Sequence, residues 1–282
     1  MRLGVHVSTE GGIHQAVERA HELGCNTMQI FSRNPQRWRV DFLRPQDIEE
    51  FNRRQDKYKI QPLFVHIPYL INLASPNPRL YEASVEAYIE DILEAFTLRA
   101  DYIVTHMGSH KETSEEQGLE RLVQALKRIL KKTEYTNVGI LLENTAGSGS
   151  WLGYTFSHQK KILQGLDHNE RVGLCLDTAH AYLAGYDIAT KEGLGATLAE
   201  IDKLAGIDLI KLIHLNDARD PLGAQRDRHE HIGKGHIGLE GMRRIINHPQ
   251  LRNKPFILET PKDSEKADSQ NLAVVRKLRK QG

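Results

Sequence analysis

The sequence contains few cysteines and no long apolar run. Only Cys25 and Cys175 occur among the 282 residues, which excludes a disulfide framework and a cysteine-based zinc site. No apolar run reaches the roughly 18 residues that a membrane helix needs, and the amino-terminal segment lacks the apolar region of a signal peptide. We therefore expect a soluble, cytoplasmic protein with no membrane partner.

An excess of charge of one sign is also lacking. The chain has 38 Lys and Arg residues against 37 Asp and Glu residues, a formal net charge of +1. A protein that bound nucleic acid through a field covering its whole surface would be strongly basic. Any nucleic-acid partner must therefore be recognised by a local surface.

The sequence does contain six apolar stretches of strand length that each end in His, Asp or Glu. These residue types are a minority of the chain, so their repeated placement needs a structural cause. If the stretches are parallel strands of one sheet, their carboxyl ends gather on one rim. The stretches are Pro62–His66, Tyr102–His106, Val138–Glu143, Arg171–Asp177, Leu209–His214 and Pro255–Glu259.

Strand and helix patterns alternate along the whole chain, which is typical of βα units around a parallel sheet. Eight of each predict an α/β fold, a single-domain (β/α)8 TIM barrel over residues 1–282, with a metal site at the carboxyl-terminal rim of its strands. The predicted strands are 2–7, 26–31, 62–66, 101–106, 138–143, 171–177, 208–214 and 255–259. The predicted helices lie near 11–23, 45–58, 78–99, 114–132, 155–166, 192–205, 238–247 and 265–280.

Three further residues extend the set of possible metal ligands. His180 follows Asp177 by three residues, so the turn after that strand places the two side by side. Taken alone, Asp177 could equally cap the next helix; the repeated strand endings favour a metal site. Asp227 and His229 are two residues apart, so in an extended loop they point the same way and can chelate one ion.

The nine candidates suit three metal ions, because a zinc ion takes about four to five ligands including water. Five imidazoles and four carboxylates favour Zn2+, or Mn2+ as second choice, over Mg2+. Clustered metals of this kind support phosphodiester hydrolysis. The candidates are His66, His106, Glu143, Asp177, His180, His214, Asp227, His229 and Glu259.

Several motifs together resemble the endonuclease IV family, the abasic-site endonucleases of base-excision repair. The similarity extends from Gly4–Ser8 to Glu259–Thr260, almost the full chain. The motifs are Glu143–Gly147, Asp177 with His180, Gly185–Asp187, His214–Asp217, Asp227–His229 and Gly233–Gly235.

The resemblance implies a hydrolase with three Zn2+ that cleaves the phosphodiester 5′ to an abasic site in duplex DNA, leaving a 3′-hydroxyl and a 5′-deoxyribose phosphate. All nine family ligand positions are matched. By this analogy Glu143 bridges two ions, and either Glu143 or Glu259 assists the attacking hydroxide. His66 and His106 complete the coordination of one ion, and Asp177, His214 and Glu259 complete that of the second. The third ion is held by His180, Asp227 and His229.

The same resemblance implies an enzyme that acts on duplex DNA with abasic or 3′-blocked lesions. Nothing in the sequence suggests an obligate oligomer, so we expect a monomer. Tyr69 and Leu70 match the residues that enter the duplex so that the abasic nucleotide flips out. The basic, aromatic loop Phe31–Arg39 suits phosphate contact and base stacking. Within it the inserted Arg of some relatives aligns with Gln36, so Arg37 would substitute from one place away. His6 lies in a rim-facing segment, where it could touch substrate.

Two other functions use the same residues. A divalent-metal sugar isomerase or epimerase on this barrel would need only Glu143, Asp177, His214 and Glu259, and would leave the Asp227 and His229 pair without a role. A catalytically silent DNA-damage binder would keep the DNA-contacting loops, but its metal ions would have saturated coordination, since structural zinc sites lack an open position for water.

Overall fold

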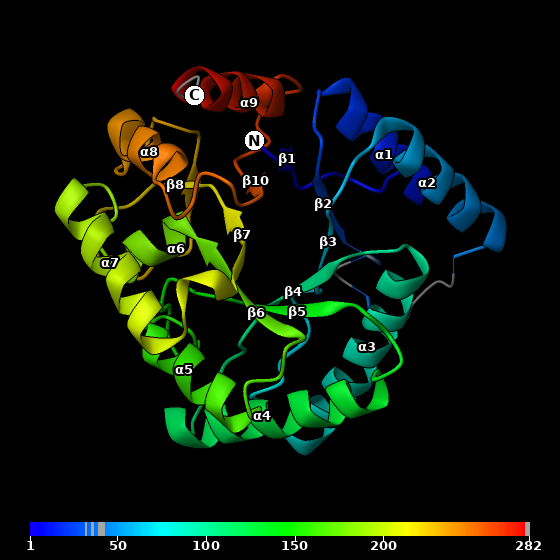
Figure 1. Cartoon of the computed structure of the whole chain (residues 1–282). Coiled ribbons are helices and arrows are strands. Elements are labelled where there is room, and N and C mark those ends of the chain that lie inside the picture. The colour runs from blue at the N-terminus through cyan, green and yellow to red at the C-terminus, as the bar shows by residue number, and fades with distance from the viewer. Residues whose placement is uncertain (32, 35–36, 39–42, 280–282) are drawn as a thin grey trace.

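The computed structural model describes residues 1–31, 33–34, 37–38 and 43–279. Within them eight parallel strands form one sheet in the order β1-β10-β7-β6-β5-β4-β3-β2, which encloses a central axis with helices outside (Figure 1). The predicted TIM barrel is confirmed. The strands are β1 (Leu3–Val5), β2 (Met28–Phe31), β3 (Leu63–His66), β4 (Tyr102–His106), β5 (Gly139–Glu143), β6 (Val172–Asp177), β7 (Ile210–His214) and β10 (Phe256–Leu258).

The barrel closes between β1 and β2, the two ends of the strand order. Just beyond β1, His6 forms a parallel bridge with Gln29 of β2, and the amide of Val7 donates to the Gln29 carbonyl at 2.8 Å. This pairing is short compared with the ladders elsewhere in the barrel. It brings the side chains of His6 and Gln29 to the rim where the other strands end.

The helices follow the predicted pattern, and none in the described part of the chain is long and apolar enough to cross a membrane. Local chemistry fixes several starts: Ser114 and Gln117 form a capping box at α4, and Asn77 caps α3 ahead of Pro78. The helices are α1 (Ile13–Glu22), α2 (Pro45–Tyr58), α3 (Pro78–Thr97), α4 (Glu115–Lys132), α5 (Phe156–Gly165), α6 (Thr178–Leu183), α7 (Lys191–Leu204), α8 (Gly238–Asn247) and α9 (Ala267–Leu278), with a 3-10 turn at Ile207–Leu209.

Three details of the sequence prediction were wrong. Each strand begins one or two residues later than predicted. The six-residue helix α6 was missed because it is too short to show a helical period; it starts where the Asp177 carboxylate accepts the amide of His180 at 2.7 Å. The loop that carries Asp227 also contains a short antiparallel pair, β8 (Asp217–Ala218) and β9 (His229–Glu230).

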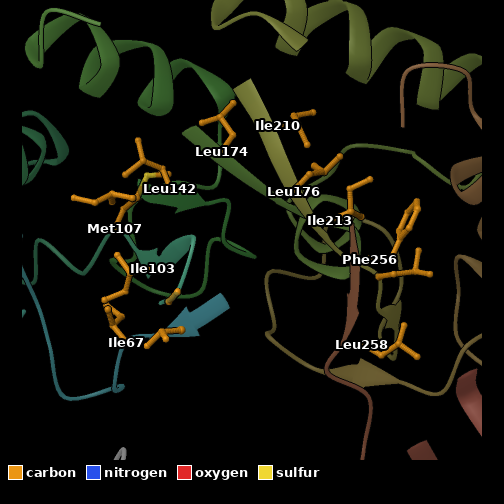
Figure 2. Packing of buried hydrophobic residues seen from close by; sticks show 14 of the residues in the cluster. Ile67, Ile103, Met107, Leu142, Leu174, Leu176, Ile210, Ile213, Phe256 and Leu258 are labelled. Atoms are coloured by element: carbon orange, nitrogen blue, oxygen red, sulfur yellow. The ribbon is translucent and has the colours of Figure 1, made fainter. Parts of the chain in front are cut away.

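Two apolar clusters explain why the polar strand ends converge. The larger cluster includes strand residues such as Leu142, Leu176 and Ile213 (Figure 2). A smaller cluster contains the alternate residues of the same strands, which face the barrel axis. Side chains two positions apart on a strand share a face. Each residue of the smaller cluster is followed, two positions later, by a candidate ligand, and that ligand is therefore also directed to the barrel axis. The smaller cluster is Phe64, Val104, Leu141, Cys175, Leu212 and Ile257.

Candidate metal centre

Three overlapping groups of candidate ligands lie at this rim, and within each the ligand atoms all fall within 4.8 Å of one another. Ligands of one zinc ion lie about 2.0–2.2 Å from it and hence roughly 3–4 Å apart. Glu143 and Asp177 each belong to two groups, so carboxylates link neighbouring positions. The groups are His66, His106 and Glu143; Glu143, Asp177, His214 and Glu259; and Asp177, His180 and His229.

His180 and His229 face each other through their Nε2 atoms. Nδ1 of His180 is 2.9 Å from the carbonyl oxygen of Asn144, and Nδ1 of His229 is 3.0 Å from that of Glu259. A carbonyl oxygen only accepts, so each neutral ring carries its proton on Nδ1 and a lone pair on Nε2. The two Nε2 atoms are 3.3 Å apart. Two neutral rings so placed need a positive charge between them, which a metal ion supplies when bound; without one, Asp177 and Asp227 raise the pKa of His180 well above its usual value despite its burial.

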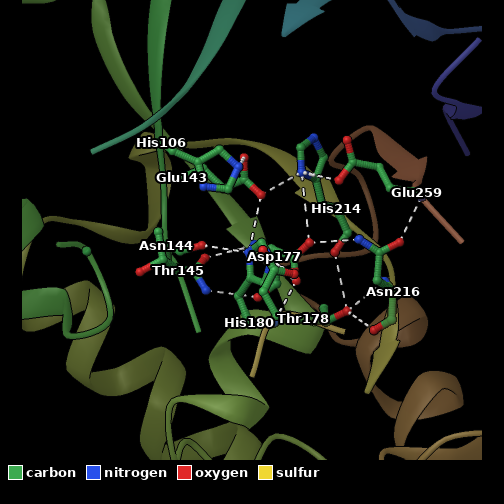
Figure 3. Close-up of polar contacts among 12 residues, drawn as sticks. His106, Glu143, Asn144, Thr145, Asp177, Thr178, His180, His214, Asn216 and Glu259 are labelled. Carbon is green, nitrogen blue, oxygen red and sulfur yellow. Dashed lines mark hydrogen bonds and ion pairs between the residues drawn. The ribbon is translucent and has the colours of Figure 1, made fainter. Parts of the chain in front are cut away.

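His214 faces carboxylates in the same way. Its Nδ1 lies 3.0 Å from Oε1 of Glu143 and 3.2 Å from Oε2 of Glu259, contacts that Figure 3 shows on either side of the ring. Burial alone would lower the pKa of His214, but the nearby carboxylates raise it well above its usual value. A bound cation would supply the positive charge that these oxygens favour.

Glu143 lies at the middle of the cluster and is fully buried. Nε2 of His66 and of His106 lie 3.2 and 3.4 Å from its Oε2, and Nδ1 of His180 lies 3.4 Å from its Oε1. Burial would raise the pKa of Glu143, but the imidazoles, led by His106 and His214, hold it well below its usual value. The carboxylate is therefore ionised and surrounded by imidazole nitrogens.

These contacts pass a physical test for metal binding. The converging atoms are imidazole nitrogens and ionised carboxylate oxygens, and the described residues offer no thiolate among them. Such a buried cluster is costly unless positive charge lies among its atoms, and a metal ion supplies that charge without protonation of the imidazoles. The site therefore fits divalent metal ions that bind nitrogen and oxygen ligands.

Asp227 is the one predicted ligand outside the three groups. Its Oδ1 lies 2.9 Å from Nε2 of His180 and 3.6 Å from Nε2 of His229, so it lies next to the third group. Burial would raise the pKa of Asp227, but His180 and His229 lower it below its usual value. Its side chain is 53% exposed, the most open of the nine.

A cavity of about 460 Å³ lies over this cluster, and two of the four predicted DNA-contacting residues line it. His6 and Tyr69 line it together with Lys262. Tyr69 is 68% exposed, whereas Leu70 is half-buried and Arg37 is exposed. Gln36, the neighbour of Arg37 in the predicted DNA-contacting loop, lies outside the described residues.

Sequence reasoning missed three buried amide side chains that orient the ligands. Asn144 exchanges two hydrogen bonds with the backbone of Asp177, at 3.0 and 2.8 Å. Asn216 donates to Oδ2 of Asp177 at 2.7 Å and accepts the amide of Glu259 at 2.8 Å. Gln29 contacts His214 and Glu259. The sequence signal that could have identified Asn144 and Asn216 was an uncharged amide one or two residues beyond a strand-end ligand. For Gln29 it was an amide inside an apolar strand.

The fold and the site define a metal-dependent TIM-barrel enzyme, and comparison with known proteins narrows this class. Residues 17–280 match the family described as xylose isomerase-like TIM barrel. A probable endonuclease 4 of Methanoculleus marisnigri is 44% identical over 276 residues, 98% of each chain. A second, from Halothermothrix orenii, is 42% identical over 264 residues, 94% of this chain and 95% of that one.

Solved structures agree. The crystal structure of endonuclease IV from Thermus thermophilus superposes with a TM-score of 0.88 at 34% identity, covering 99% of this chain and 98% of that one. A D-tagatose 3-epimerase-like protein reaches a TM-score of 0.75 at 21% identity, over 99% of this chain and 97% of that one, which shows the fold alone. The chain belongs to the endonuclease IV family.

Proposed function

We propose that this enzyme hydrolyses the phosphodiester 5′ to an abasic site in duplex DNA, leaving a 3′-hydroxyl and a 5′-deoxyribose phosphate. The observation that carries the proposal is the continuous set of ligand groups joined by Glu143 and Asp177, in a chain of the endonuclease IV family. A sugar epimerase needs only the group of Glu143, Asp177, His214 and Glu259, and has no use for His180 and His229.

Three Zn2+ are the proposed cofactors, with Mn2+ as a substitute at one or more positions. His66, His106 and Glu143 would hold the first, Glu143, Asp177, His214 and Glu259 the second. His180, Asp227 and His229 would hold the third. When bound, ions of this kind activate water as a nucleophile at neutral pH and neutralise charge on phosphate oxygens.

The two candidate catalytic carboxylates have different surroundings. Glu143 is fully buried among imidazoles, whereas Glu259 is 19% exposed and lines the cavity. Burial would raise the pKa of Glu259, but His214, whose Nδ1 lies 3.2 Å from Oε2, holds it below the usual value. A carboxylate of low pKa is a weak base. We therefore assign to Glu259 the orientation of the attacking water through Oε2, and to Glu143 the linking of neighbouring ions.

The substrate surface includes His6, Arg37, Tyr69 and Leu70, and the substrates are duplexes with abasic or 3′-blocked lesions. The chain would act as a monomeric single domain in the cytoplasm. A local surface of this kind suits a protein whose net charge is only +1, because bound ions make the site itself attractive to phosphate. Tyr69, exposed above the cavity, is the side chain best placed to enter a base stack.

The decisive experiment is incision of an end-labelled duplex that contains one tetrahydrofuran abasic analogue. We expect a nick 5′ to the analogue with a 3′-hydroxyl end, lost after metal is stripped with a chelator and restored by Zn2+. The analogue cannot undergo β-elimination, so cleavage by a lyase would give no product. Failure of protein verified to hold its metal to cut this duplex would overturn the proposal.

Replacement of Tyr69 by Ala should weaken use of damaged duplex more than it harms the metal site. Loss of one stacking side chain costs about 1–3 kcal/mol, so we expect KM for the tetrahydrofuran duplex to rise roughly tenfold with unchanged metal content. Tyr135 offers a matched control, because it is 67% exposed and lies beyond α4, away from the rim. An equal effect of Tyr135→Ala would contradict the assignment of Tyr69.

A further inference from the structure

Gln29 is a polar residue of the site that is not itself a candidate metal ligand. It is fully buried on β2, a barrel strand that carries none of the nine candidate ligands, and it lies at the short pairing with His6 that closes the barrel. A buried glutamine is costly unless its amide is fully hydrogen-bonded. The partners of Gln29 therefore show what the residue does.

The amide contacts three groups of the site. Its Nε2 lies 2.6 Å from Oε1 of Glu259 and 2.9 Å from Nδ1 of His6. Its Oε1 lies 2.8 Å from Nε2 of His214. An amide has two N–H donors and one carbonyl acceptor, so these contacts use both donors and one lone pair.

The orientation of this amide is fixed by Glu259. An ionised carboxylate can only accept, and the carboxylate of Glu259 lies 2.6 Å from one end of the Gln29 amide and 3.2 Å from Nδ1 of His214. The opposite orientation would place two oxygens 2.6 Å apart. The amide nitrogen of Gln29 must therefore face Glu259.

With the amide fixed, the proton of His214 is fixed as well. The carbonyl oxygen of Gln29 accepts, so His214 donates from Nε2 and keeps a lone pair on Nδ1. That Nδ1 is the atom that faces Glu143 and Glu259 at 3.0 and 3.2 Å. Gln29 thereby presents His214 in the one neutral form that can bind a metal ion in this group.

The other two contacts have equally definite consequences. Oε1 of Glu259 is engaged by Gln29, so Oε2 is the oxygen left for a metal ion or water. Nδ1 of His6 accepts from Gln29, so the neutral ring of His6 carries its proton on Nε2. That atom is buried without a hydrogen-bond partner among the described residues. His6 thus keeps a donor unused on the wall of the cavity.

We propose that Gln29 is a positioning residue of the centre, whose amide sets the tautomers of His6 and His214 and leaves Glu259 one free oxygen. This inference rests on the proposed function for its value to catalysis, but the tautomers themselves do not depend on DNA cleavage. Hydrogen-bond partners of metal ligands commonly contribute about 10–100-fold to metal affinity or activity.

The first test is long-range proton–nitrogen NMR on the zinc-loaded enzyme with ¹⁵N-labelled histidine. We expect the rings of His6 and His214 both to carry a proton on Nε2, with His6 identified by its absence from His6→Ala. A ring of His6 protonated on Nδ1 would overturn the proposal, whether or not the enzyme cuts abasic DNA. This measurement needs no variant of Gln29 to fold.

Two variants then separate the donor and acceptor halves of the amide. Gln29→Glu can still accept from His214 but cannot donate to His6, so the signal of His214 should persist while that of His6 changes. Gln29→Met removes both halves and should alter both rings. If neither ring responds to either variant, the proposal fails.

Metal binding provides the second readout. Competition with a chromophoric chelator should show a roughly 10–100-fold loss of zinc affinity for one bound ion in Gln29→Met. Gln55→Met is the matched control, since Gln55 is also buried, lies on α2 and has an amide nitrogen without a hydrogen-bond partner among the described residues. Equal zinc affinity in Gln29→Met and Gln55→Met would contradict a positioning role.

Discussion

Replacement of Glu143 by Gln should reduce kcat/KM on abasic duplex by about 10³-fold or more, a loss of at least about 4 kcal/mol of transition-state stabilisation. Glu143 is the ligand that belongs to both the group of His66 and the group of His214. An amide has one oxygen in place of two and no charge, so it cannot link two cations. The proposed hydrolysis depends on neighbouring ions and would be lost with that link.

The same substitution should leave the fold intact, which makes the result interpretable. The amide nitrogen of Gln can donate to the lone pair that Nε2 of His66 directs at this position, 3.2 Å from Oε2 of Glu143. The variant is therefore expected to unfold at about the temperature of the parent protein without added metal. Elemental analysis should find fewer bound ions per chain.

Glu94→Gln is the control for this prediction. Glu94 is also a buried glutamate, but it lies on α3 and burial raises its pKa to about 8, so it is largely neutral at pH 7. Replacement of its carboxyl group by an amide should change incision little. Incision by Glu143→Gln at the rate of Glu94→Gln would show that the bridging position has been assigned to the wrong carboxylate.

The sequence was sufficient to predict the barrel and the cluster because both follow from local regularities. Apolar stretches such as Ile103–Thr105 identify a strand, and the polar residue after each stretch, such as His106, identifies its end. Parallel pairing then brings those ends together without any knowledge of side-chain contacts. For this reason the candidate ligands converge although the strand boundaries were wrong by one or two residues.

The supporting contacts could not be predicted in this way, because each joins residues that no local pattern connects. Gln29 meets Glu259 across 230 positions of the chain, and Asn216 meets Asp177 across 39. Their partners depend on strand order and on the register of pairing. The short helix α6 was missed for a related reason: its start depends on the cap that Asp177 provides.

Asp217 also makes contacts that no local sequence pattern predicts, and it anchors the loop that carries Asp227 and His229. The carboxylate is buried and accepts hydrogen bonds from five backbone amides at 2.9 to 3.3 Å. Gly235 must be glycine there, because a Cβ would lie 2.3 Å from the carbonyl oxygen of Ala218 and 2.6 Å from Oδ1 of Asp217. The amides belong to Ala218, Gly233, Gly235, Ile237 and Gly238.

Asp217→Asn should therefore destabilise the protein by about 3 kcal/mol, since hydrogen bonds to a charged group contribute about 1.5–3 kcal/mol each. The Asn side chain presents an NH2 group where Asp presents an oxygen, so amides such as those of Gly233 and Gly235 would face a donor. The loop loses its anchor, and we expect the ion that we propose Asp227 and His229 hold to be lost first. Denaturant unfolding and elemental analysis measure the two effects.

Asp101→Asn shows what a single such contact contributes. Asp101 precedes β4 at the opposite end of the barrel, where its carboxylate accepts one backbone amide, that of Leu63, at 2.9 Å. We expect a loss of at most about 1 kcal/mol and full metal content. If Asp217→Asn were no more damaging than Asp101→Asn, the amides around Asp217 would be satisfied without its charge. The loop would then owe its position to the metal ligands themselves.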